Sequence, residues 1–162
     1  MNIERLSRLA EVLESQKLIA NVSFHLATWL DADIRPPVTA ERVSAGTGTD
    51  NYAVVDAAVL SCGTVACAVG HAALIPEFQA LGLKMVRDVT PDQFDFGALP
   101  FFDGKVSWAA VHAFFDIDED WADYLFMGTR YDSSPSPNQV AARIREVIAD
   151  ELHERAITQS GN

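Results

Sequence analysis

The feature that most constrains the fold is an apolar run in the middle of the chain, "AAVLSCGTVACAVG", residues 57–70. It contains no charged side chain and is bounded by Asp56 and His71. A helix that spans a bilayer needs about 20 apolar residues, so this run predicts a buried core element rather than a membrane span. Its small residues are typical of a helix against which neighbours pack closely. We therefore predict a central helix over residues 57–75, regular from residue 63 to 74.

Both cysteines of the chain lie in this run, close to a histidine. Helical spacing of four residues places Cys67 and His71 on one ridge, with Thr64 one turn earlier. We favour a packing role, in which Gly63 and Gly70 allow close backbone contact and a carbonyl or carboxylate binds the His71 ring. A Cys62–Cys67 disulfide is disfavoured, because a helical separation of five residues does not bring the Cα atoms within about 7 Å.

Two chemical alternatives remain for the cysteines. Cys62 at the N-terminus of the predicted helix would have a lowered pKa and could serve as the nucleophile of an enzyme. Its base would be His25 or His112, because His71 lies about 13.5 Å away along the helix at 1.5 Å per residue. The other alternative is a zinc site made by Cys62, Cys67 and His71, but no further Cys/His pair completes the usual set of four ligands. We expect no cofactor.

Several other segments carry local signals for helices. Residues 3–14 place leucines on one face and charges on the other. The stretches "TPDQF" (90–94) and "SPNQV" (136–140) have a capping Ser or Thr, then Pro, then Gln, and the second opens a helix of about 20 residues. Ser107 is expected to cap "WAAVHAFF", Asp118 to cap "EDWADYLF", and Gly82 to end a helical turn that begins at Pro76.

The remaining segments have weaker patterns. Residues 22–29 and 83–87 are read as one short β-hairpin, and residues 31–51 as a loop rich in Pro and Gly. Trp29, Trp108 and Trp121 are assigned to the core. The sequence thus predicts a mainly α protein, a compact single-domain orthogonal helical bundle over residues 1–157 with a disordered tail over 158–162.

The charge of the chain limits its partners. It carries 12 Lys and Arg against 23 Asp and Glu, for a net charge of −11. This charge repels nucleic-acid phosphates and anionic membranes. Most of it falls within residues 88–132, where ten acidic residues face only Lys105 and Arg130. We predict a protein partner with a basic surface and leave the oligomeric state open. The predicted contact residues form an acidic face of Asp116, Asp118, Glu119, Asp120 and Asp123.

The start of the chain lacks an apolar stretch behind a basic segment, so a cytoplasmic location with reduced cysteines is expected. Together, these features favour a non-enzymatic protein-interaction module. The main alternative is a cysteine-dependent enzyme centred on Cys62. A zinc-binding protein is the less favoured alternative.

The segment "CGTVACAVGHA", followed by "IPEF", "FF", "YLF" and "SPNQVAARI", resembles an uncharacterised family of small bacterial and phage proteins with a Cys-Gly-Thr-x-x-Cys-x-x-Gly-His core. The resemblance covers most of the chain and brings no known activity. It implies a phage-associated accessory role, such as binding and diverting a host complex. Asp116 stands where the resemblance leads one to expect glycine after the paired phenylalanines.

Overall fold

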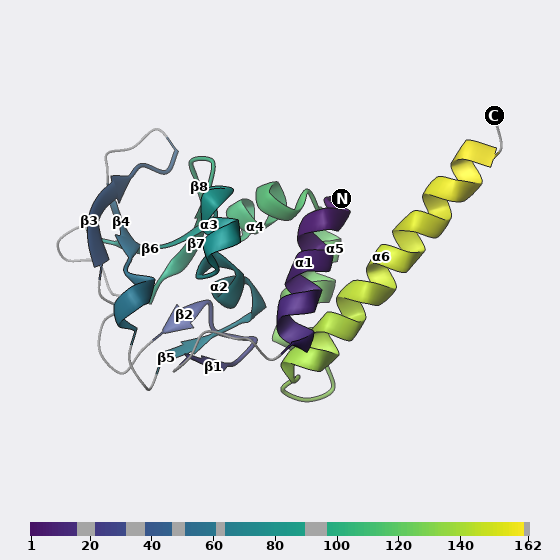
Figure 1. The fold of residues 1–162 in the computed structure, drawn as a ribbon, viewed down its shortest axis with the longest axis horizontal. Helices are drawn as coiled ribbons and strands as arrows, with labels where there is room; N and C mark the ends of the chain where they lie inside the picture. Colours follow the sequence, from purple (N-terminus) through teal and green to yellow (C-terminus); the bar gives the residue numbers. More distant parts are fainter. Residues whose placement is uncertain (16–21, 32–37, 47–50, 61–63, 90–96, 161–162) are drawn as a thin grey trace.

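The computed structural model describes residues 1–15, 22–31, 38–46, 51–60, 64–89 and 97–160 (Figure 1). Within these ranges the chain is a mixed α/β protein with two β-sheets. The predicted mainly α helical bundle is therefore wrong. The predicted helix start at residues 90–94 lies outside the described residues, and so does Cys62.

The central apolar run does not form one helix. Its described part consists of the 3₁₀ turn η1 (Ala57–Val59), strand β5 (Thr64–Ala66) and helix α2 (Ala68–Ala73). Periodicity cannot separate a short buried strand from a buried helix, because both are apolar on every side. The β-branched Thr64 and Val65 suit a strand, and Cys67 begins the helix as its N-cap.

Strand β5 is the middle strand of a three-stranded sheet. It pairs in parallel with β1 (Val22–Phe24) and antiparallel with β2 (Leu30–Asp31). Phe24 and Leu30 both lie opposite Ala66 on the two sides of β5. The segment between β1 and β2, residues 25–29, therefore crosses one end of this sheet.

The second sheet has five antiparallel strands in the order β3-β4-β6-β7-β8. The strands are β3 (Val38–Val43), β4 (Tyr52–Val55), β6 (Lys84–Asp88), β7 (Leu99–Phe102) and β8 (Lys105–Val106). The hairpin predicted between residues 22–29 and 83–87 is wrong, because β1 pairs with β5 while β6 pairs with β4 and β7. The segment predicted as a loop, residues 31–51, contains strand β3. This strand forms because it pairs with β4, and the Pro- and Gly-rich composition of the segment does not indicate that pairing.

The other helices agree better with their local signals. They are α1 (Ile3–Glu14), α3 (Pro76–Ala80), α4 (Trp108–Phe115), α5 (Glu119–Phe126) and α6 (Pro137–Ser160), with the 3₁₀ turn η2 (Gly128–Arg130) between the last two. Gly82 has φ +97° just after α3, as expected of a glycine that ends a helical turn.

The predicted helix caps can be checked one by one. The amide of Trp121 donates to Asp118 at 2.9 Å, and the Ser136 amide donates to the Gln139 side chain at 2.8 Å. Both caps are confirmed. Ser107 precedes α4, but its side chain makes no capping hydrogen bond and its φ is +58°. Asp116 ends α4 in the left-handed conformation, which glycine adopts at lower cost.

Helices α1 and α6 pack together beside the two sheets, and α2 lies between the sheets (Figure 1). One hydrophobic cluster joins residues of α1, α2, α4, α5, α6 and both sheets.

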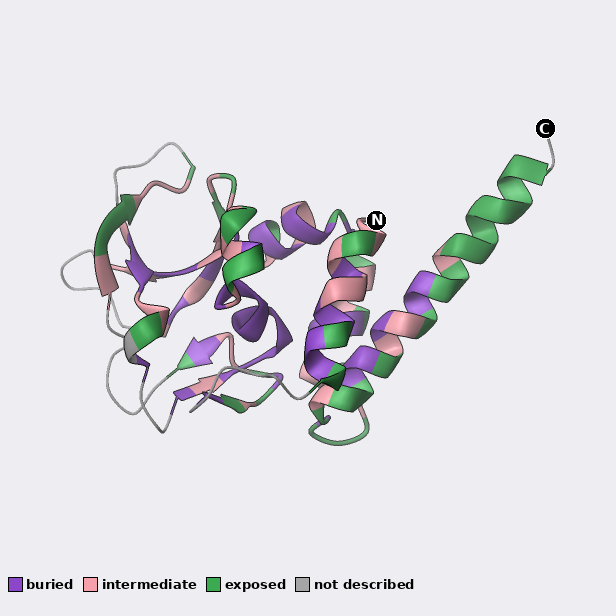
Figure 2. Cartoon of the chain, viewed as in Figure 1, coloured by how far each residue is buried: buried purple, intermediate pink, exposed green. Residues whose placement is uncertain are grey.

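The last turns of α6 extend away from this body and are exposed (Figure 2). Leu152, on this part of α6, is 51% exposed. Helix α6 continues to Ser160, through part of the segment expected to be a tail. Within the described ranges, no helix combines the length and hydrophobicity needed to cross a bilayer.

Candidate functional site

An apolar cavity lies between the β1–β2 connection and the segment that joins α5 to α6. We call it the indole pocket; its volume is about 450 Å³. Its lining residues come from three parts of the chain and are His25, Leu26, Ala27, Trp29, Trp108, Phe126, Met127, Gly128, Thr129, Ser134 and Pro135. None of these is Asp, Glu, Lys or Arg.

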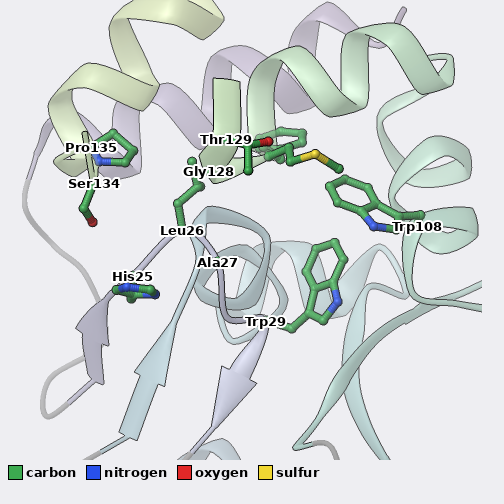
Figure 3. Close-up of a pocket in the computed structure, with 11 residues that line it drawn as sticks. His25, Leu26, Ala27, Trp29, Trp108, Gly128, Thr129, Ser134 and Pro135 are labelled. Atoms are coloured by element: carbon green, nitrogen blue, oxygen red, sulfur yellow. The ribbon is translucent and has the colours of Figure 1, made fainter. Parts of the chain in front are cut away.

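Two tryptophans form one end of the indole pocket. The rings of Trp29 and Trp108 lie with their centroids 4.7 Å apart and their planes at 67°, so the edge of one meets the face of the other. Figure 3 shows the two indoles at one end and His25, Ser134 and Pro135 at the other. Trp29 and Trp108 are half-buried and pack against the core, as predicted, but they also line this cavity, which the sequence did not indicate.

The cysteine motif fixes the position of Trp29. The backbone amide of Cys67 donates to the carbonyl of Thr28 at 2.6 Å and to that of Trp29 at 3.3 Å. A Cβ atom on Gly70 would lie 1.8 Å from the Trp29 carbonyl oxygen, so only glycine fits there. Gly70 is therefore a point of close backbone contact, as predicted, and the contact holds one wall of the indole pocket.

The opposite wall is held by Arg143 of α6. Its guanidinium donates to the carbonyls of Tyr124 and Arg130, each at 2.9 Å. The same group lies 3.5 Å above the ring of Tyr131. Tyr131 in turn donates its hydroxyl hydrogen to the Leu125 carbonyl at 2.9 Å. These contacts fix the segment that begins at Met127 and ends at α6, which contributes five pocket residues.

Cys67 and His71 are both buried, in agreement with the predicted packing role. Burial raises the pKa of the Cys67 thiol to about 11 and lowers the pKa of His71 to about 4, and the Ser23 backbone opposes the second shift only in part. Both side chains are therefore neutral at pH 7. The Cys67 sulfur accepts a hydrogen bond from the Gly70 amide at 3.4 Å, and the His71 ring stacks on Phe24.

Neither ring nitrogen of His71 has a hydrogen bond of ordinary geometry within the described residues, and the backbone of Ser23 is the polar neighbour that acts on the ring. No group of three or more His, Cys, Asp or Glu side chains in that part of the chain could hold a metal ion. Because Cys62 lies outside it, the zinc set of Cys62, Cys67 and His71 stays untested.

The two histidines proposed as catalytic bases lie on different elements. His25 is exposed at the rim of the indole pocket, with its Nδ1 atom 3.4 Å from the Thr28 hydroxyl. His112 is half-buried on α4, and its ring centroid lies 6.4 Å from that of Trp108. Their distance from Cys62 is not described, so the enzyme hypothesis is also untested.

The acidic face lies at the turn between α4 and α5. Asp116, Asp118, Glu119 and Asp120 are exposed there, whereas Asp123 is half-buried with an oxygen 3.7 Å from the Arg130 guanidinium. Helix α5 connects this face to the indole pocket, because its last residue, Phe126, lines the cavity. The structure thus places the exposed acidic residues and the indole pocket at opposite ends of one short helix.

Comparison with known proteins gives no further assignment. No protein-family model, curated protein or solved structure matches the chain. The resemblance carried by the Cys-Gly-Thr segment therefore remains a hypothesis.

Proposed function

We propose that this protein is a non-enzymatic interaction module that binds a protein partner with a basic surface and takes one side chain of that partner into the indole pocket. The observation that carries the proposal is the cavity of about 450 Å³ with two tryptophans in its wall. Tryptophan-lined, largely desolvated pockets are where protein interfaces concentrate their binding free energy.

The fixed walls of the pocket further support binding. Arg143 on one side and Cys67 with Gly70 on the other hold the two walls of the pocket through backbone contacts. A pocket with fixed walls loses little conformational entropy when it is filled.

The acidic face has a supporting role in this proposal. Exposed carboxylates on α5 would attract a basic surface and increase the rate of encounter, while the pocket provides the close contact. The net charge of −11 opposes direct binding to nucleic acid. We place the protein in the cytoplasm as part of the same proposal.

The proposal is tested by selecting binders from a random peptide library and measuring the affinity of the selected peptides for variants. Ala27 is exposed and lines the pocket, so Ala27→Phe fills the cavity without disturbing the core. Ala149→Phe adds the same ring at an exposed position on α6 and is the matched control. We expect Ala27→Phe to weaken binding by about 30-fold, the effect typical of a lost interface anchor, and Ala149→Phe to leave it unchanged.

Selected peptides that bind Ala27→Phe and the original protein equally well would contradict the proposal. The enzyme alternative is tested on the same material with Cys62→Ala. We expect this variant to retain peptide binding and stability. A loss of biological activity with peptide binding intact would instead favour the cysteine-dependent enzyme.

A further inference from the structure

The wall of the indole pocket has the electrostatic character of a cation site. The face of an aromatic ring carries the negative part of its quadrupole, and tryptophan binds cations most strongly among the aromatic residues. Trp29 and Trp108 meet at 67°, so they present two aromatic surfaces at an angle to one another. The edge of one ring covers part of the face of the other, so a cation in the cavity would meet the aromatic face that stays open.

No positive group inside the cavity opposes such a ligand. The lining contains no Lys or Arg, and His25 is its one titratable side chain. It also contains no Asp or Glu, so the cation would be held without a direct ion pair. This arrangement favours a broad, weakly hydrated cation over a compact one, because the water lost on entry is not replaced by a carboxylate. Guanidinium fits this description better than the ammonium of lysine.

The rest of an arginine side chain also has suitable neighbours. Leu26, Phe126 and Met127 provide apolar surface for its methylene groups. The lining also includes the hydroxyl of Thr129, whereas that of Ser134 lies at the end opposite the indoles (Figure 3). Such hydroxyls can accept hydrogen bonds from guanidinium N–H groups.

Charges outside the cavity add to this preference. Asp31 is exposed two residues after Trp29, and Asp132 is exposed in the segment that follows Thr129. Glu119 and Asp120 lie at the far end of α5. Two bases belong to this wall: Arg130 lies 3.7 Å from Asp123, and Arg143 is engaged with two backbone carbonyls and the ring of Tyr131. At physiological ionic strength exposed carboxylates act over about 8 Å, so those closest to the entrance contribute most to attracting a positive ligand.

We infer that the indole pocket receives an arginine side chain from the basic surface of a protein partner. This inference rests on the proposed function and names the chemistry of the anchoring side chain. The same chain already holds arginines in this way, since the Arg5 guanidinium carbon lies 4.4 Å from the ring centroid of Phe114 and that of Arg143 lies 3.5 Å from that of Tyr131. In both cases a guanidinium N–H also donates to a backbone carbonyl.

The test compares arginine with its uncharged isostere, citrulline. N-acetyl-arginine amide and N-acetyl-citrulline amide are titrated separately while the indole N–H signals of Trp29 and Trp108 are followed by NMR. We expect arginine amide to shift both signals and to bind about tenfold more tightly than citrulline amide, because only the charged ligand gains from the ring quadrupoles. Ala27→Phe should abolish the shifts and Ala149→Phe should preserve them. Trp108→Phe, which keeps an aromatic ring, should weaken arginine binding about threefold.

The outcomes separate this inference from the proposed function. Equal binding of citrulline and arginine, blocked by Ala27→Phe, would overturn the cation inference and leave the pocket as an anchor site for uncharged groups. Peptide binders that depend on the open pocket but contain no arginine would overturn it as well. If neither amide shifts the indole signals and Ala27→Phe also leaves peptide binding unchanged, both proposals fail together.

Discussion

Replacing Gly70 with alanine should destabilise the protein and displace Trp29 at the same time. Gly70 lies on α2, and a Cβ atom there would lie 1.8 Å from the Trp29 carbonyl oxygen and 3.0 Å from the Cβ atom of Ala66. The Trp29 carbonyl cannot easily move away, because it accepts a hydrogen bond from the Cys67 amide. The clash must therefore be relieved by moving α2 or the backbone that carries one indole of the pocket.

Two opposing terms set the size of this effect. An exposed glycine in a helix gains about 1 kcal/mol when it becomes alanine. Overpacking a close-packed interior costs about 1–3 kcal/mol, and the upper end applies here because the contact is with backbone atoms. The net destabilisation of Gly70→Ala is therefore about 2 kcal/mol. For a domain of this size it corresponds to a fall in Tm of about 4–8 °C.

The measurement is urea-induced unfolding of Gly70→Ala, with Gly128→Ala as the control. Gly128 also lies against the β1–β2 connection, but a Cβ atom there meets nothing closer than the Cβ atom of Ala27 at 3.9 Å. Gly128→Ala should therefore unfold within about 0.5 kcal/mol of the original protein. Tryptophan fluorescence of the folded state should change in Gly70→Ala alone. Equal stability of the two variants would refute the close contact between α2 and Trp29.

Three other predictions follow from named contacts. Arg143→Gln removes the guanidinium that stacks on Tyr131 and its hydrogen bonds to two carbonyls. The free energy of unfolding should fall by about 2 kcal/mol, and binding of arginine amide should weaken. Unchanged binding would show that the second wall of the pocket does not depend on Arg143. His71 has a folded-state pKa of about 4, below its ordinary 6.5, so the unfolded chain takes up the proton first as the pH falls. The free energy of unfolding should therefore be about 2 kcal/mol lower at pH 5 than at pH 7.5, and this difference should be smaller in His71→Gln. Urea titrations of both proteins at the two pH values measure it. The double variant Glu119→Gln, Asp120→Asn should bind a basic selected peptide about threefold more weakly than the original protein at low salt, and equally well at high salt. A loss of affinity that does not depend on salt would argue against electrostatic attraction.

Helix caps were the most predictable part of this protein from its sequence. Asp118 and the Ser136–Gln139 pair were identified with their hydrogen bonds, because capping involves residues only three positions apart. The amphipathic helix over residues 3–14 was equally clear, and the structure ends it at Glu14. Ser107 was the exception, since a left-handed backbone conformation directs its side chain away from the capping position.

The site was only partly predictable. Cys67, Gly70 and His71 were expected to pack in the core, and they do. Their effect on Trp29 could not be expected, because it depends on the backbone of residues 28 and 29 crossing the start of α2. Trp29 and Trp108 are far apart in the sequence, and nothing in either neighbourhood indicates that their rings meet.

The sequence by itself determined the short-range features, namely where α1, α5 and α6 begin and which of their faces are apolar, because these depend on neighbouring residues along one helix. Tertiary structure decided whether the apolar run became strand or helix, since Thr64–Ala66 gained β1 and β2 as hydrogen-bonding partners on both sides. It also created the indole pocket from three separate segments. Backbone pairing between distant segments costs chain entropy that only the complete core can offset, so local patterns alone do not specify it.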